Sequence, residues 1–193
     1  MNLHLCDFDG TLTKEDSFLR FLLYAVPMPR LLFGSILLIF RFLALFFSRK
    51  WSNEVAKAAV LSEFFKGKTT EEMEHWGLKF YQEIFPSLMR AELLETLRTA
   101  CQKRETVVIV SASPDMWLRP FCREEGFELI CTELAYESGK FTGKFSTPNC
   151  NGAEKARRIL ANYHLELFEK TIAYGNSKGD AAMFALADEV IKF

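Results

Sequence analysis

The chain has 193 residues, of which 49% are hydrophobic and 25% charged, enough for one buried domain or for a core domain with a smaller insertion, and too apolar for disorder. Its formal net charge is −1 and it contains no basic run or low-complexity tract, so nucleic acid is not expected as a partner. The five cysteines are scattered and never spaced as C-x-x-C, which argues against a disulfide framework or a zinc knuckle and fits a reducing, cytoplasmic location.

The first predicted strand is Leu3–Cys6, a short apolar run that ends at Asp7-Phe8-Asp9-Gly10-Thr11. No basic region of the kind that begins a secretion signal precedes it. A helical pattern then separates this strand from the next one. We therefore expect a helical cap, residues 14–99, inserted into a core of residues 1–13 and 100–193. Helices are expected within the cap at Asn53–Phe65, Thr70–Gln82 and, less regularly, Glu92–Cys101.

The later strands alternate with helices. A β-branched run, Thr106–Val110, stops at Ser111-Ala112-Ser113-Pro114, and the following helix, Asp115–Glu125, closes with Gly126 at the C-cap position. Short antiparallel strands are expected within Leu134–Phe145. This alternation predicts an α/β fold with a Rossmann-like parallel sheet whose strands carry the site at their carboxyl ends. The other expected strands are Phe127–Cys131, Thr171–Tyr174 and Glu189–Lys192, and a further helix is expected at Ala153–Tyr163.

Asp7-x-Asp9-Gly10-Thr11 places two carboxyl groups directly after the first strand. Taken alone, an ordinary turn explains the pattern equally well, whereas a calcium loop would need another ligand at Thr11. A carboxylate at a strand end can attack phosphorus and form an acyl-phosphate. A neighbouring carboxyl group, here Asp9, can protonate the leaving oxygen and then accept a proton from water. Two carboxylates repel a phosphate dianion, so this chemistry needs a hard divalent cation such as magnesium.

Polar residues after the later strands supply the remaining parts of such a site. Ser111 follows the second strand, where its hydroxyl and the loop amides can bind phosphate oxygens beside a helix N-terminus. Lys155, early in a predicted helix, can offset the charge of a carboxylate and a phosphoryl group. Asn176 and Asp180 are oxygen-bearing side chains four residues apart, a spacing that suits a shared metal.

These four motifs, in this order, resemble those of the haloacid dehalogenase-like phosphatases, in the phosphoserine-phosphatase-like subfamily (subfamily IB), whose helical cap lies between the first two motifs. The resemblance covers essentially the whole chain from Leu3 onward. It implies magnesium-dependent hydrolysis of a phosphate monoester through an aspartyl-phosphate intermediate. It also implies that Asp7 is the nucleophile and a magnesium ligand, and that Asp9 is the acid/base and a ligand through its backbone carbonyl. Lys155 is implied to be a catalytic residue that binds phosphate. The other implied phosphate-binding residues are Gly10, Thr11, Ser111 and Ala112, and the other implied magnesium ligands are Asn176 and Asp180.

Two positions differ from the family pattern. Many relatives have an aspartate where this chain has Asn176, so a lower affinity for magnesium is expected, with function retained. Asp16 lies where phosphoserine phosphatases place a glutamate that meets the substrate's amino group. We expect Asp16 to contribute to substrate specificity, and its shorter side chain argues against phosphoserine itself. An N-cap role for Asp16 is the alternative.

Residues 31–47 are apolar on every helical face apart from Arg41. This length falls short of the roughly 20 apolar residues that span a bilayer, and an arginine within a span is costly, so we do not expect a membrane-spanning helix. The favoured interpretation is a bent helix or helical hairpin buried in the cap or in a homodimer contact. The alternative is that its apolar face rests on the inner face of a membrane or receives a lipid chain; in composition the segment resembles the very apolar cap of the phosphatidylglycerophosphate phosphatases. In that case the cations near the lipid headgroups are Arg30, Arg41, Arg49 and Lys50.

The function expected first is cytoplasmic hydrolysis of a small phosphorylated metabolite. A second hypothesis keeps the chemistry and makes the substrate a lipid phosphate at a membrane surface. A third is a non-catalytic interaction protein that uses the apolar cap as a docking surface. The full set of Asp7, Asp9, Lys155 and Asp180 argues against the third hypothesis.

Overall fold

The computed structural model describes residues 1–49 and 52–193, and its centre is a sheet of five parallel strands in the order β3-β2-β1-β6-β7. The central strand β1 is buried along its whole length, because helices cover both faces of the sheet. The predicted parallel sheet of an α/β fold is therefore confirmed. The strands are β1 (Leu3–Cys6), β2 (Thr106–Pro114), β3 (Glu128–Thr132), β6 (Thr171–Gly175) and β7 (Glu189–Lys192).

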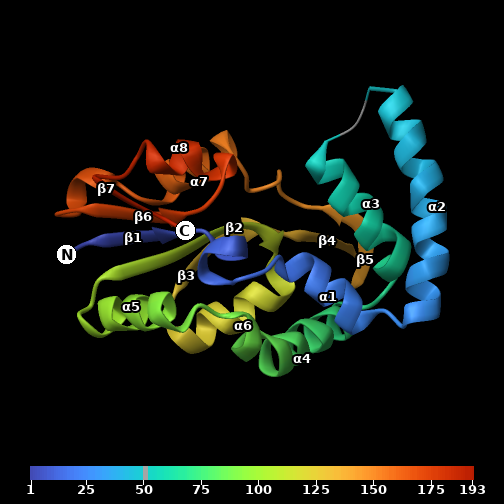
Figure 1. Ribbon diagram of the computed structural model, residues 1–193, viewed down its shortest axis with the longest axis horizontal. Helices are drawn as coiled ribbons and strands as arrows, with labels where there is room; N and C mark the ends of the chain where they lie inside the picture. Colours follow the sequence, from blue (N-terminus) through green and yellow to red (C-terminus); the bar gives the residue numbers. More distant parts are fainter. Residues whose placement is uncertain (50–51) are drawn as a thin grey trace.

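Helices α5 (Ala91–Gln102) and α6 (Asp115–Glu125) lie on one face of the sheet, and α7 (Ala153–Asn162) and α8 (Ala181–Phe184) lie on the other (Figure 1). Alternate side chains of a strand point to opposite faces. In β2, Val107 and Ile109 accordingly join the apolar cluster under α5 and α6, while Val108 and Val110 join the cluster under α7 and α8. The sheet thus separates two apolar layers and leaves its strand ends free for a site.

The helical insertion lies beyond the carboxyl ends of the strands (Figure 1). A capping box formed by Thr69 and Glu72 starts its amphipathic helix α4, and an antiparallel hairpin of β4 and β5 packs against α3. The division between core and cap at residue 99 stays a prediction, and α5 packs against β2. The remaining elements are α1 (Ser17–Ala25), α2 (Met28–Phe47), α3 (Asn53–Phe65), α4 (Thr70–Leu88), β4 (Leu134–Glu137) and β5 (Lys140–Phe145).

The structure corrects the interpretation of residues 31–47. They belong to one continuous helix, α2, which has 20 residues and so reaches the length of a membrane span, and they form neither a hairpin nor an element buried in the cap. Burial in a homodimer contact stays a prediction. Only Gly34 and Leu38 are buried, because the helix turns a single narrow stripe toward α3 and leaves the rest of its apolar surface exposed. Of the cations grouped with this segment, Lys50 lies outside the described residues.

Strand β2 and helix α4 extend well beyond their predicted bounds. Strand β2 continues through Ser111 to Pro114, because Ser111 and Pro114 still pair with β3. Helix α4 continues past Gln82 to Leu88 with Pro86 inside it, and the extra turn buries Phe85 and Leu88. This burial outweighs the hydrogen bond that the proline cannot donate.

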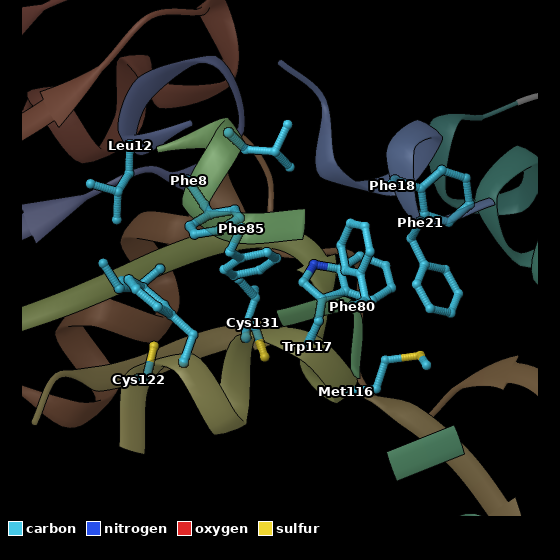
Figure 2. Packing of buried hydrophobic residues seen from close by; sticks show 14 of the residues in the cluster. Phe8, Leu12, Phe18, Phe21, Phe80, Phe85, Met116, Trp117, Cys122 and Cys131 are labelled. Atoms are coloured by element: carbon cyan, nitrogen blue, oxygen red, sulfur yellow. The ribbon is translucent and has the colours of Figure 1, made fainter. Parts of the chain in front are cut away.

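Aromatic side chains join the cap to the core in what we call the cap–core seam, formed by Phe8, Phe21, Phe80, Phe85 and Trp117 (Figure 2). The Trp117 ring of α6 lies 4.7 Å from Phe21 and 5.7 Å from Phe80, both cap residues. Phe8, from the loop after β1, lies 5.3 Å from Phe85 of α4. All five side chains are essentially buried. The seam therefore fixes how the cap sits over the strand ends.

Gly77 lets α4 lie directly against the start of α6, and Gly77→Ala is expected to destabilise the protein. A Cβ at this position would lie 2.1 Å from the Met116 carbonyl oxygen, which is backbone and cannot rotate away. Overpacking of this kind costs about 1–3 kcal/mol, more than the roughly 1 kcal/mol that alanine gains over glycine in a helix. Thermal unfolding measures the change. Lys79→Ala, at an exposed site on the same helix, serves as the control, and a Gly77→Ala protein as stable as the control would contradict the packing argument.

Candidate active site

Three predicted site residues meet at the strand ends in a buried charge cluster. Asp7 follows β1, Asp180 lies in the turn after β6, and Lys155 is in the first turn of α7. The Lys155 Nζ donates hydrogen bonds to Asp7 Oδ1 at 2.6 Å and to Asp180 Oδ1 at 2.7 Å. Lys155 and Asp180 are each 1% exposed and Asp7 is 8% exposed. One cation thus holds two carboxylates from different strands beside each other.

Burial and charge pull the pKa values of this cluster in opposite directions. Burial raises the pKa of Asp7 and outweighs the Lys155 ammonium, which lowers it. Burial alone would raise the pKa of Asp180, but Lys155 and the hydrogen bonds from Ser177 bring it below its ordinary value. Burial likewise opposes the charge on Lys155, yet the two carboxylates raise its pKa overall. Lys155 is therefore a permanent cation at neutral pH.

The Asp9 carboxyl group is held by two serines that sequence reasoning did not assign to the site. Its Oδ1 accepts from the Ser17 backbone N–H at 2.7 Å, and its Oδ2 pairs with the Ser113 hydroxyl at 2.5 Å. Burial raises the pKa of Asp9, although these hydrogen bonds oppose the shift. Asp9 thus links the first core loop to the cap helix α1 and to the end of β2. A carboxyl group that is partly buried, oriented by two hydrogen bonds and open to the pocket is suited to proton transfer.

The loop after β1, Phe8–Leu12, is a tight turn closed by a hydrogen bond from the Thr13 N–H to the Phe8 carbonyl oxygen, and it depends on Gly10. Gly10 has φ +75°, and a Cβ there would lie 2.1 Å from Asn176 Nδ2. The glycine thus allows the first and fourth motifs to touch. Next to it, the Thr11 hydroxyl donates to Asp7 Oδ2 at 2.9 Å, so both Asp7 carboxylate oxygens are held, one by Thr11 and the other by Lys155.

A pocket of about 570 Å³ opens over this cluster. Most of the predicted site residues line it, together with residues of the cap and of the loop before α7. Ser111 and Thr11 are buried and do not line the pocket, and the Ser111 hydroxyl accepts a hydrogen bond from the Ser113 N–H. Their phosphate contacts stay predictions. The predicted residues that line the pocket are Asp7, Asp9, Gly10, Asp16, Ala112, Lys155, Asn176 and Asp180.

The cap contributes a cation to the pocket that the sequence did not reveal. Lys57, on the second turn of α3, lines the pocket, and its Nζ donates to the Ala112 carbonyl at 3.3 Å. Asn53 of the same helix and Asn149 and Asn151 of the loop before α7 add neutral polar groups. No local pattern marks Lys57, because its position depends on how the cap docks on the core.

Asp16 caps a cap helix and also lies at the pocket. Its side chain accepts a hydrogen bond from the Leu19 N–H at 3.0 Å and so caps helix α1, and the residue also lines the pocket. The N-cap role is thereby confirmed. Its role in substrate selection stays a prediction.

The donor set beside Asp7 consists of oxygen atoms. No group of three or more acidic, histidine or cysteine side chains that could hold a metal occurs in residues 1–49 and 52–193. A site for a cation must therefore combine the Asp7 and Asp180 carboxylates with neutral oxygens, such as the Asn176 amide and the Asp9 backbone carbonyl. Two buried carboxylates against one lysine leave the cluster negative, and hard oxygen ligands with net negative charge fit magnesium.

Comparison with known sequences identifies relatives along nearly the whole chain. The sequence profile described as haloacid dehalogenase-like hydrolase matches residues 5–185. Protein CicA of Caulobacter vibrioides is 36% identical over 185 residues, which are 95% of this chain and 82% of CicA.

Solved structures share the fold at lower sequence identity. A protein of unknown function from Bordetella pertussis Tohama I has a TM-score of 0.80 and 20% identity, with 99% of this chain and 89% of that chain covered. A substrate-bound phosphoserine phosphatase has a TM-score of 0.66 and 19% identity, with 99% and 85% covered. The predicted resemblance to the phosphoserine-phosphatase fold is therefore confirmed.

Proposed function

The chain belongs to the haloacid dehalogenase-like hydrolases, and we propose that it is a phosphatase that hydrolyses phosphate monoesters through an aspartyl-phosphate on Asp7, with magnesium as cofactor. The observation that carries this proposal is the placement of the Lys155 Nζ between the Asp7 and Asp180 carboxylates under the pocket. A carboxylate at a strand end beside a permanent cation is positioned for attack on a phosphoryl group.

The reaction has two steps. In the first, a carboxylate oxygen of Asp7 forms a bond to phosphorus, the bond from phosphorus to the alcohol oxygen breaks, and Asp9 gives its proton to that oxygen. In the second, water attacks phosphorus, Asp9 takes the proton, and the bond between phosphorus and Asp7 breaks to release phosphate. The raised pKa of Asp9 supports its role as proton donor, and Ser17 and Ser113 orient it.

The residues that would hold magnesium are Asp7, Asp9 through its carbonyl, Asn176 and Asp180. Magnesium supplies charge neutralisation for the phosphoryl oxygens when it is bound. Lys155 contributes further positive charge at the same place, and the amides around Gly10 and Ala112 are proposed to bind phosphate oxygens. The buried hydroxyls of Thr11 and Ser111 stabilise these loops, because Thr11 donates a hydrogen bond to Asp7 and Ser111 accepts one from the Ser113 N–H.

The proposed substrate is a small phosphorylated metabolite. A pocket of about 570 Å³ is in the range of small-molecule sites. Its outer wall carries Lys57 and Lys14 as cations and Glu15 and Asp16 as anions. We propose that these charges select substrates with both an anionic and a cationic group outside the phosphate. All five cysteines are free thiols, which supports the proposed cytoplasmic location.

Hydrolysis of a panel of phosphate esters, with and without magnesium, tests the function. The panel contains an aryl phosphate, phosphoserine, phosphocholine, sugar phosphates and a lipid phosphate. We expect magnesium-dependent release of phosphate from the aryl ester and from at least one small metabolite. Selective hydrolysis of the lipid phosphate would show that the substrate is a lipid phosphate and not a small metabolite. If none of the esters is hydrolysed, the hypothesis of a non-catalytic interaction protein is favoured instead.

Asn176→Asp is expected to bind magnesium about five- to tenfold more tightly, because a carboxylate replaces a neutral amide next to the Asp7 and Asp180 carboxylates. The dependence of thermal unfolding on magnesium concentration measures the affinity without any substrate. Asn162→Asp, which adds the same charge at an exposed site on α7, is the matched control. Equal magnesium dependence in the two variants would show that residue 176 is not a metal ligand.

A further inference from the structure

Helix α2 presents an exposed apolar stripe formed by Phe33, Ile36, Phe40, Leu43 and Phe47. These residues recur every three or four positions, so they share one face of the helix. Phe33, Phe40 and Phe47 are 66%, 67% and 79% exposed, values unusual for phenylalanine in a water-soluble surface. A face of this size marks an interaction site.

The opposite face of α2 is fixed to the cap. Gly34 lies so close to Phe64 of α3 that an added Cβ would meet its ring at 2.4 Å, and Leu38 is 5% exposed. The Arg30 guanidinium also donates to the Phe64 carbonyl oxygen at 2.8 Å. The helix has the length and mean hydropathy, 2.1, of a membrane span. Its packing on α3, however, holds it along the surface of the cap. It can therefore enter a membrane surface only with its axis parallel to the plane of the bilayer.

The charged side chains of residues 17–53, which include α2, are all positive, whereas Glu63 of α3 lies beside Gly34 on the face that packs against the cap. Residues 17–53 contain no aspartate or glutamate, although the whole chain has a net charge of −1. Arg30 and Arg41 are eleven residues apart, which places them on the same flank of the helix, about 100° from the centre of the apolar stripe. An apolar stripe flanked by cations is the arrangement of a helix that lies in the plane of a bilayer. The cations of residues 17–53 are Arg20, Arg30, Arg41, Arg49 and Lys50.

We propose that α2 docks the protein on the surface of an anionic lipid bilayer, with the exposed apolar stripe in the acyl-chain boundary and Arg41 at the headgroups. A second copy of the chain fits this face less well. Two α2 helices packed stripe to stripe would bring their arginines together, and residues 17–53 offer no acidic side chain to pair with them. Anionic headgroups supply that missing charge.

This docking does not depend on the proposed catalysis, because no residue of the apolar stripe lines the pocket. It does connect the membrane with the site, since α3, the element on which α2 packs, carries Asn53 and Lys57 into the pocket wall. A docked α2 would therefore place α3, and with it one wall of the pocket, on the membrane side of the protein.

Flotation of the purified chain with lipid vesicles tests the inference. We expect the protein to float with phosphatidylcholine vesicles that contain an anionic phospholipid, to float less with phosphatidylcholine alone, and to be released by salt. The triple variant Phe33→Gln, Ile36→Gln and Phe40→Gln is expected to lose more than about tenfold in partition coefficient, and Arg41→Gln about fivefold. Thermal unfolding and aryl phosphate hydrolysis show whether each variant is folded.

The matched control replaces exposed apolar residues elsewhere, as Leu160→Gln and Leu167→Gln, which are 55% and 76% exposed in the wild type. This control is expected to float like the wild type. The inference is overturned if the wild type stays with the unbound fraction, if the triple variant floats equally well, or if vesicle charge has no effect. It is also overturned if light scattering shows a stable dimer that the triple variant converts to a monomer and neither protein floats.

Discussion

Asp7→Asn is expected to lower kcat for an aryl phosphate by at least about 10⁴-fold, because an amide cannot form the acyl-phosphate on which turnover depends. The substitution keeps the size and shape of the side chain. It removes one of the two carboxylates that Lys155 contacts and leaves Asp180 to balance the ammonium charge. The fold should therefore persist, as thermal unfolding of the variant would show.

The control for Asp7→Asn is Asp188→Asn, which removes a carboxylate at an exposed position outside the pocket. This variant should hydrolyse the ester at the wild-type rate. If the wild type is quenched with acid during turnover, we also expect to recover phosphorylated protein. The phosphoryl group should be on the peptide that contains Asp7. A folded Asp7→Asn protein that retains a tenth of wild-type turnover would refute the nucleophile assignment.

Lys155→Met is expected to damage both stability and activity. The variant leaves the Asp7 and Asp180 carboxylates side by side, buried and without a cation, and loss of one partner from a buried charge cluster costs about 3–5 kcal/mol in the free energy of unfolding. The loss of positive charge at the phosphoryl group should lower kcat by about 10³-fold. Denaturant unfolding and steady-state kinetics measure the two effects separately.

The pH dependence of unfolding tests the cause of this instability. The pKa of Asp180 is lowered in the wild type, so its ion pair stabilises the fold above the ordinary carboxyl pKa, and this contribution disappears as the pH falls through the lowered value. The stability gap between wild type and Lys155→Met should therefore narrow in acid. Asp180→Asn added to Lys155→Met should restore part of the stability and none of the activity. If the difference in unfolding free energy between wild type and Lys155→Met does not change with pH, the loss of stability comes from packing and not from the buried charges.

Local patterns predicted most of the fold. Helices Asn53–Phe65 and Asp115–Glu125 and strand Glu189–Lys192 have the predicted bounds. Their ends are set by neighbouring residues, such as Gly126, whose φ of +73° closes α6. The surroundings of α2 were not predictable in this way. Composition shows that a helix is apolar, but only the tertiary arrangement shows which of its faces is covered.

The charge cluster could be anticipated because parallel strands end at one edge of a sheet. That rule brings Asp7 and Asp180 together from positions far apart in the chain, whereas Lys155 joins them from the first turn of α7 and was assigned from the order of the four motifs. No such rule predicts two other contacts of the site, that of Asp9 with Ser17 and that of Lys57 with Ala112. Each joins the cap to the core, and the docking of the cap is decided by apolar packing distributed over many residues.

The cap–core seam affects how substrates can enter the site. Swinging the cap away would expose Trp117 and the phenylalanines around it, about 150–250 Å² for each ring, at a cost on the order of 10 kcal/mol. That is comparable with the whole stability of a typical domain. We therefore expect substrates to reach Asp7 through the mouth of the pocket while the seam stays closed.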